Sequence, residues 1–526
     1  MGRLQKKQLM ENVSMLGEAC HVLEQQSMGP VYVNLCADIQ EFISAICNFL
    51  ESITGEETET AGLLCELYQL LFRVSQGEAQ ANQLISCVKK IETCAYEELR
   101  LNQMEAAFFC YKASMSDCLE SIYFAAKEDP AWDPYFIPIP YYDRNPDGSL
   151  GEMHYEGEGC YSPRYQLVDW RSYDVKARKP DVVYIMAPFD EYNLVTSVHP
   201  DFYASRLKGC TDLLVYIPYI VHSEVVDLSA GSFPGVRFSH KVIVQSENVR
   251  KQYIHSLIHP SQGLTPEMAE EKVVALGSPK TDKVWNSRKR DYTLPEEWSR
   301  MLGEDGSKKL VLLYNLSIET ALTYSQGEAG DRYLKKLRSI FQFVQNHKEV
   351  VLWWRPHPLL AQTFRSMRPG LYQEYEELVK DYQERGLGIY DDSADMNRAI
   401  AYADACYGDE SSLNLLLQFA GKPVLIQDIK NGGRETAAGE GEACVERAMD
   451  AFIAREHYNS YILYEGWDAS NGGVSLAGFI RHLDVILKWS TEQSMKYRKR
   501  YENGDGTAGQ KIHEYISQVL RRMDHE

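Results

Sequence analysis

Residues 350–358 read Val-Val-Leu-Trp-Trp-Arg-Pro-His-Pro, an apolar run that ends abruptly in Arg355 and His357. A short apolar run bounded by polar segments is typical of a buried strand in a parallel sheet. The prolines stiffen the backbone, so both side chains would meet a ligand with little loss of entropy. Arginine offers a planar fork for phosphate oxygens, and histidine can donate to phosphate or carry a proton. The stretch predicts a phosphate site at a strand end; the alternative is an arginine paired with a carboxylate and a capping histidine.

Similar apolar runs recur on both sides of this stretch and alternate with helical segments. This alternation predicts parallel βαβ units. The runs occupy residues 106–111, 135–139, 182–187, 213–217, 241–245, 272–276, 310–314, 349–354, 388–390, 403–407 and 423–426. We therefore predict an α/β protein with two Rossmann-like, doubly wound domains facing a cleft. Residues 106–300 would form the acceptor-side domain, and residues 301–526 the nucleotide donor-side domain with terminal helices.

Residues 1–105 have a different pattern, because their apolar residues recur at helical spacing. Breaks at Gly29-Pro30, Gly55 and Gly77 divide this region into helices. We expect a helical bundle or coiled-coil-like module that contributes no side chain to the cleft. Docking or oligomerisation is its expected use.

Composition limits the classes of partner. The 526 residues carry a formal net charge of −20, which disfavours nucleic acid as a partner. The 12 cysteines form no Cys-x-x-Cys pair and lie among apolar residues, which is typical of reduced thiols. No apolar run approaches the ~20 residues that span a bilayer. We predict a cytoplasmic protein, with peripheral contact at the inner face of the membrane left open.

Two further segments follow expected strands of the second domain. Residues 408–412 read Gly-Asp-Glu-Ser-Ser and precede the helical run LNLLLQF. A helix N-terminus with two hydroxyls binds phosphate readily, so Glu410, Ser411 and Ser412 join Arg355 and His357 as candidate donor-phosphate residues. Plain helix capping is the alternative. Residues 314–317, Tyr-Asn-Leu-Ser, either touch the nucleotide or turn the chain.

Candidate general bases come from the first domain. His222 is the first choice, because a histidine is neutral and basic near pH 7 without special tuning. Asp190 is the second catalytic candidate, with Glu191 and His199 nearby in sequence. Each lies near the end of an expected strand, and each could instead have a structural role. No G-x-G-x-x-G or Walker A segment occurs, so we predict no cofactor, and we predict no metal site.

These segments resemble the CDP-glycerol glycerophosphotransferases of teichoic acid assembly, which have a glycosyltransferase-B-like fold. The resemblance is carried by residues 241–246 (KVIVQS), 276–282 (LGSPKTD), 355–358 (RPHP), 404–423 and 505–507 (DGT). It implies diphosphate contacts for Arg355, His357, Ser411 and Ser412, and a catalytic role for His357. The family's His-Gly-Thr-Pro loop is absent, and His222 is only a positional substitute. The family's Thr-Asp-Tyr-Ser-Ser is replaced by residues 408–412.

The resemblance implies a transferase that moves a glycerophosphate-like group from a CDP-linked donor to a polyol-phosphate or glycan-type acceptor. Two alternatives stay open. One is a nucleotide-sugar glycosyltransferase or an enzyme similar to UDP-N-acetylglucosamine 2-epimerase. The other is a non-catalytic nucleotide-binding scaffold that recruits partners through its N-terminal helices.

Overall fold

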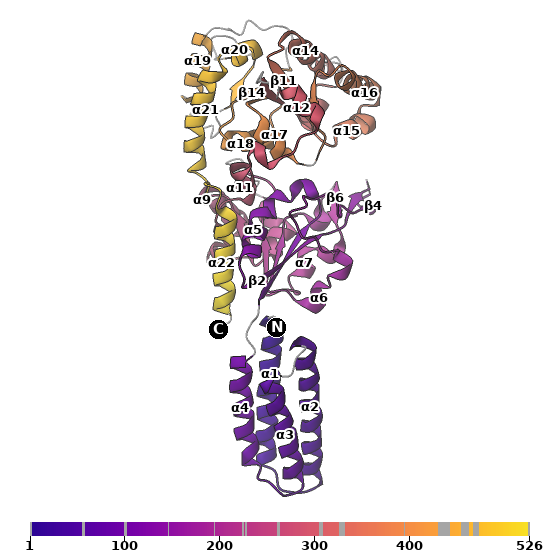
Figure 1. Ribbon diagram of the computed structural model, residues 1–526, viewed down its shortest axis with the longest axis vertical. Helices are drawn as coiled ribbons and strands as arrows, with labels where there is room; N and C mark the ends of the chain where they lie inside the picture. Colours follow the sequence, from indigo (N-terminus) through magenta and orange to yellow (C-terminus); the bar gives the residue numbers. More distant parts are fainter. Residues whose placement is uncertain are drawn as a thin grey trace.

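The computed structural model describes residues 3–54, 58–98, 103–145, 147–193, 195–222, 226, 229–259, 263–303, 309–325, 332–393, 395–429, 442–453, 462–465 and 473–523. Within these ranges a helical bundle is followed by two α/β domains stacked along the long axis (Figure 1). Across the same ranges, no helix combines the length and apolarity that crossing a membrane requires.

The N-terminal region is an antiparallel bundle, drawn in indigo and purple in Figure 1. It consists of α1 (Arg3–Glu24), α2 (Pro30–Thr54), α3 (Glu59–Ser75) and α4 (Asn82–Glu98). Helical spacing places Leu9, Val13 and Leu16 on one buried face of α1. The bundle core draws its residues from between Leu9 and Ala95, so the bundle closes on its own apolar face.

The first domain is built on a parallel sheet in the order β2-β1-β5-β7-β8-β9. Its strands are β1 (Met104–Cys110), β2 (Trp132–Pro138), β5 (Val182–Ile185), β7 (Leu213–Tyr216), β8 (Lys241–Val244) and β9 (Val273–Ala275). All lie on apolar runs expected from the sequence. The strand order reverses between β1 and β5, so the topological switch point of this sheet lies there.

Helices cover this sheet, with η denoting short 3-10 helices. They are η1 (Ala113–Met115), α5 (Asp117–Glu128), η2 (Trp170–Ser172), α6 (Val175–Arg178), η3 (Asp190–Tyr192), η4 (Pro200–Phe202), α7 (Ala204–Leu207), η5 (Ala230–Ser232), α8 (Pro234–Phe238), α9 (Glu247–Leu257) and α10 (Pro266–Lys272). An antiparallel sheet in the order β4-β3-β6 extends the domain, and the apolar runs did not predict it. It contains β3 (Tyr141–Arg144), β4 (Leu150–His154) and β6 (Thr196–Val198).

The second domain has a parallel sheet in the order β12-β11-β10-β13-β14-β15. The strands are β10 (Leu310–Leu316), β11 (Val350–Pro356), β12 (Gly388–Tyr390), β13 (Ala405–Gly408), β14 (Val424–Ile426) and β15 (Leu463–Tyr464). Numbered from β10, this is the 3-2-1-4-5-6 order of dinucleotide-binding folds. Its switch point lies between β10 and β13. Both domains therefore have the Rossmann-like, doubly wound architecture expected from the sequence.

The helices of the second domain are α13 (Ile318–Thr323), α14 (Arg332–Asn346), α15 (Leu360–Met367), α16 (Pro369–Glu384), α17 (Met396–Tyr402), α18 (Ser412–Phe419), α19 (Glu442–Ile453), α20 (Leu476–Arg481) and α21 (Leu483–Arg498). The connection between the domains contains α11 (Pro279–Asn286), η6 (Lys289–Asp291) and α12 (Glu296–Leu302). Trp298 and Met301 of α12 pack on the second core.

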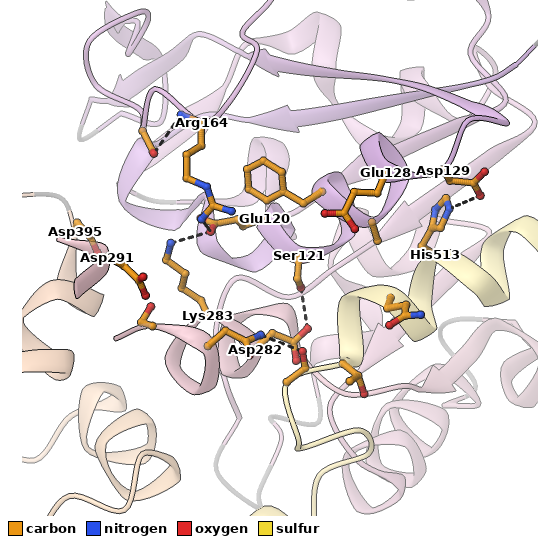
Figure 2. Close-up of a pocket in the computed structure, with 18 of the residues that line it drawn as sticks. Glu120, Ser121, Glu128, Asp129, Arg164, Asp282, Lys283, Asp291, Asp395 and His513 are labelled. Atoms are coloured by element: carbon orange, nitrogen blue, oxygen red, sulfur yellow. Dashed lines mark hydrogen bonds and ion pairs between the residues drawn. The ribbon is translucent and has the colours of Figure 1, made fainter. Parts of the chain in front are cut away.

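The C-terminal helix α22 (Ala508–Met523) returns to the first domain (Figure 1). Ile512, Ile516 and Leu520 are buried in the first-domain core, although the sequence analysis grouped this segment with the second domain. Asp282 of α11 fixes the return. Its carboxylate accepts a hydrogen bond from Ser121 Oγ at 2.8 Å (Figure 2) and another from the Gly509 amide at 2.7 Å.

Candidate functional site at the two switch points

The polar segments expected after β10, β11 and β13 lie side by side at the carboxyl edge of the second sheet. In the strand register, Asn315 of β10 stands opposite Arg355 on one side and Gly408 on the other. Gly408 has φ +146°, and a Cβ there would lie 2.0 Å from the Asn315 carbonyl oxygen. Only glycine permits so close an approach. The switch point thus joins three segments that are far apart in the sequence.

A hydrogen bond from Asn315 Nδ2 to Ser411 Oγ, 2.8 Å long, crosses this switch point. The adjacent Asp409 is buried, and its carboxylate accepts hydrogen bonds from the Ser317 amide at 2.7 Å and from Gln427 Nε2. Burial raises the pKa of Asp409 to about 6. These contacts fix the loop before α18. The N–H groups of the first helical turn and the hydroxyl of Ser411 therefore lie together at the same end of the helix.

Glu410 and Ser412 flank Ser411 in this loop, and both are exposed. Ser411 is the N-cap residue of α18 with extended backbone, and its side chain makes no capping hydrogen bond within the described structure. Its hydroxyl is engaged by Asn315 instead. The plain capping role considered from the sequence is therefore not the role that Ser411 has.

Arg355 is committed to partners inside the protein. It is buried, lies 3.1 Å from Asp391 as an ion pair, and donates to the Ser393 carbonyl oxygen. Burial lowers the pKa of the Arg355 guanidinium, and the Asp391 charge partly offsets this effect. This arrangement is the arginine–carboxylate pairing that the sequence left open as the alternative. Arg355 thus shapes the loop after β12 through its ion pair with Asp391 and its hydrogen bond to Ser393.

His357 is exposed, and the charge of Lys112 in the first domain acts on it. Its Nδ1 accepts a hydrogen bond from the Leu359 amide at 3.2 Å, which leaves the proton of the neutral ring on Nε2. Neighbouring atoms partly shield the His357 ring from water, and this desolvation lowers its pKa. The positive charge of Lys112 lowers the pKa further. Lys112 follows β1 of the first domain, so the carboxyl edges of the two sheets face each other here.

Lys112 was not among the residues selected from the sequence. Its Nζ lies 4.9 Å from the ring centroid of Tyr141, which holds the ammonium by a cation–π contact. The available signal was its position, because it comes directly after the aromatic strand AAFFCY. A lysine at the carboxyl end of a switch-point strand is placed to meet an anionic ligand.

Asp190 lies at the switch point of the first sheet, after β5. Its φ is +43°, in the left-handed region that few non-glycine residues adopt. The side chain is buried, and Oδ2 accepts a hydrogen bond from the Ala204 amide at 2.7 Å. Burial raises the pKa of Asp190 to about 7. A cavity of about 10 Å³ beside Asp190 and Tyr111 has room for about one water molecule.

His222 follows β7, further from the switch point. Its Nε2 lies 2.9 Å from the Tyr253 hydroxyl, and Gln245 binds both its amide and its carbonyl group at 2.8 Å. Burial lowers the pKa of His222 to about 4, so its ring is a weak base. His199 accepts a hydrogen bond from the Asp201 amide, and Glu191 is exposed in η3.

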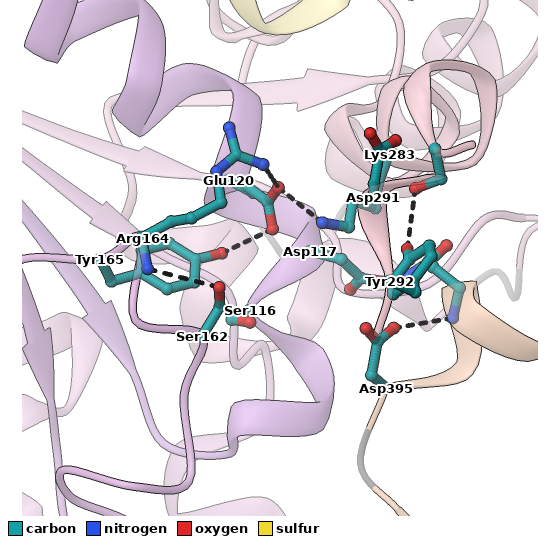
Figure 3. A network of polar contacts seen from close by, with 12 residues as sticks. Ser116, Asp117, Glu120, Ser162, Arg164, Tyr165, Lys283, Asp291, Tyr292 and Asp395 are labelled. Carbon is teal, nitrogen blue, oxygen red and sulfur yellow. Dashed lines mark hydrogen bonds and ion pairs between the residues drawn. The ribbon is translucent and has the colours of Figure 1, made fainter. Parts of the chain in front are cut away.

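A cavity of about 680 Å³ lies elsewhere, between α5, α11 and α22 (Figure 2). Its polar network joins the domains (Figure 3): Lys283 of α11 contacts Glu120 of α5 at 2.7 Å, and Tyr165 donates to the same carboxylate at 3.0 Å. Lys280 and Asp117, one turn away on the same two helices, form a buried ion pair of 2.8 Å. This cavity is part of the interdomain joint, and the strand-end residues above do not line it.

Fold and site together define a protein with two Rossmann-like domains whose polar switch points face each other. No family model matches the sequence, and no curated protein matches it either. Among solved structures, the chain is similar to the wall teichoic acid polymerase TagF, with 12% identity, 88% of this chain and 98% of that chain covered, and a TM-score of 0.45. It is also similar to UDP-GlcNAc 2-epimerase of Methanocaldococcus jannaschii, solved with UDP-GlcNAc and UDP, with 10% identity, 79% and 100% coverage, and a TM-score of 0.44.

Proposed function

We propose that the protein is a transferase that moves an alditol phosphate, such as glycerophosphate, from a CDP-linked donor to an acceptor hydroxyl in surface-polymer synthesis. The observation that carries this proposal is the position of the Asn315–Ser411 contact at the second switch point. It lies at the edge that faces Lys112 of the first domain. Ligands of doubly wound sheets bind at such crevices.

The donor diphosphate would bind at the start of α18. The Ser411 and Ser412 hydroxyls, the helix N–H groups and His357 Nε2 are hydrogen-bond donors there, and Lys112 adds positive charge. Phosphoryl transfer depends on such fixed donors and charges, because they stabilise charge on the phosphate oxygens. Arg355 would act indirectly, by holding the loop at Ser393. Glu410 carries a negative charge and therefore suits a donor hydroxyl better than a phosphate.

In the reaction, the acceptor hydroxyl oxygen attacks the β-phosphorus of the donor. The bond from this phosphorus to the bridging oxygen breaks, and CMP leaves with the electron pair. The acceptor proton passes to Asp190 through a water molecule in the adjacent cavity. Asp190 takes the place first given to His222, because a pKa of about 7 suits a general base at neutral pH better than one of about 4.

A nucleotide-binding scaffold without turnover is the second candidate. The engagement of Arg355 by Asp391 and of His222 by Tyr253 favours it, since both side chains are held away from chemistry. Release of CMP from CDP-glycerol, measured over a panel of polyol-phosphate acceptors, separates the two functions.

Binding is tested by thermal unfolding with CDP, UDP, GDP and ADP. A ligand at about 100-fold its dissociation constant adds about 2.7 kcal/mol to the free energy of unfolding, and CDP should give the largest shift. His357→Ala should weaken CDP binding about 10-fold, the value of one hydrogen bond to a charged group. His347→Ala is the matched control, because His347 directly follows α14 and its ring contacts Phe343 of that helix. Unchanged affinity in His357→Ala, or no binding of any nucleotide, would contradict the proposal.

A further inference from the structure

The hydrogen bond between Asn315 and Ser411 leaves one side-chain proton without a partner among the described residues. Asn315 Nδ2 donates and Ser411 Oγ accepts at 2.8 Å. A serine hydroxyl has one proton, and an acceptor for it is not found among the described residues. The Asn315 amide therefore binds one lone pair of Ser411 Oγ. The hydroxyl proton of Ser411 stays available for a hydrogen bond to a ligand.

The opposite orientation of the Asn315 amide gives the same result. If Oδ1 accepted the Ser411 proton, the amide NH₂ would keep a proton for an external acceptor. In both orientations the pair presents a hydrogen-bond donor, so its preferred partner is an acceptor such as a phosphate oxygen.

The backbone holds Asn315 firmly for this purpose. Asn315 is 8% exposed, and its carbonyl oxygen accepts a hydrogen bond from the Asp409 amide at 2.9 Å. Gly408 packs against the same peptide group. The backbone from which the Asn315 side chain extends is thus fixed. Asn315 is the penultimate residue of β10 and lies beside the start of α18.

We propose that Asn315 is a positioning residue that orients the Ser411 hydroxyl as a donor to the phosphate groups of the nucleotide. This inference rests on the proposed function, because the phosphate is that of the donor nucleotide. It assigns Asn315 a task in diphosphate recognition and none in recognition of the base or the sugar.

The test compares the full chain with Asn315→Ala, Ser411→Ala and the double variant by titration calorimetry with CDP and with cytidine. Asn315→Ala should weaken CDP binding about 10-fold and leave cytidine binding unchanged. The double variant should bind CDP no more weakly than Ser411→Ala, because Asn315 acts through Ser411. Asn315→Asp should weaken CDP binding at least as strongly. The carboxylate would accept the hydrogen bond of the Ser411 hydroxyl, and its negative charge would repel the phosphate.

Thr320→Ala is the matched control. It removes a hydroxyl that Ser317 Oγ contacts at 2.8 Å beyond the same strand, on the side of α13, and it should leave CDP binding unchanged. Thermal unfolding confirms that each variant is folded. If Asn315→Ala does not fold, Ser411→Ala still tests the contact, because Ser411 is partly exposed and its replacement disturbs the core less. Equal loss of CDP and cytidine affinity, or additive losses in the double variant, would overturn the inference alone. If the unaltered chain bound no nucleoside diphosphate, the proposed function would fall with it.

Discussion

A buried carboxyl group lies at each of the two switch points, Asp190 after β5 and Asp409 after β13. Burial raises the pKa of Asp190 to about 7 and that of Asp409 to about 6. An acid whose pKa is higher in the folded than in the unfolded chain binds its proton more tightly when folded. Its ionisation therefore costs stability as the pH rises through 6 to 7, and the cost disappears as the pH falls towards the unfolded value near 4.

The pH dependence of turnover distinguishes the candidate bases. A base must be unprotonated, so with Asp190 as the base kcat/KM should fall tenfold for each pH unit below about 7. With His222 as the base it should stay flat down to about pH 4. Asp190→Asn should lower kcat by about 10²- to 10⁴-fold and remove this acidic limb. His222→Ala is the comparison, and loss of the limb in that variant would contradict the assignment to Asp190.

At the same scale, the sequence predicted where most side chains of the candidate site lie but not their partners. Residues 350–358 predict a strand followed by Arg355 and His357, and the structure has both at the end of β11. Asp391, which forms the ion pair with Arg355, follows another strand. No pattern in the neighbouring sequence connects the two residues. Burial shifts the pKa values of Asp190 and His222 in opposite directions, and it depends on packing that a linear pattern does not contain.

Among the elements, β10 and β13 set the shape of the candidate phosphate site through Gly408. Gly408→Ala should destabilise the protein by about 3 kcal/mol or more, because the added Cβ meets the Asn315 carbonyl oxygen and the backbone is left-handed. Urea unfolding measures the loss. Gly421→Ala, also at positive φ but with only side-chain atoms of Ser494 within 3.7 Å, is the control for strain alone and should cost less. Equal losses in the two variants would contradict the close-approach argument.

Elements with a strong apolar period were predictable, and elements without one were not. Buried parallel strands such as β1 and β11 are continuous apolar runs, so both domains could be predicted from the sequence. β3 and β4 are largely exposed and carry a register shift between Tyr142 and Arg144, so they leave no such run. The helix α22 was expected, but a helical period does not reveal which core its apolar face enters.

For the whole molecule, the bundle and the two α/β domains have separate cores, while α5, α11 and α22 hold the α/β domains together. Removing residues 1–102 should therefore leave CDP affinity and the unfolding temperature of the α/β domains unchanged. If the bundle mediates oligomerisation, light scattering should show fewer chains per particle for the truncated protein than for the full chain. A folded, truncated protein that no longer binds CDP would contradict this division of labour.

The return of α22 has a consequence for synthesis of the protein on the ribosome. The last strand of the first sheet, β9, is complete at Ala275, but the helix that covers part of that core ends at Met523. At about 5–20 residues per second, roughly 12 to 50 seconds separate the two events. During this interval the surface that later receives Ile512, Ile516 and Leu520 stays open, while the second domain emerges and folds. Of the two α/β domains, the one translated first is thus completed last, and a chain that stops before α22 leaves an apolar surface for chaperones and proteases to recognise.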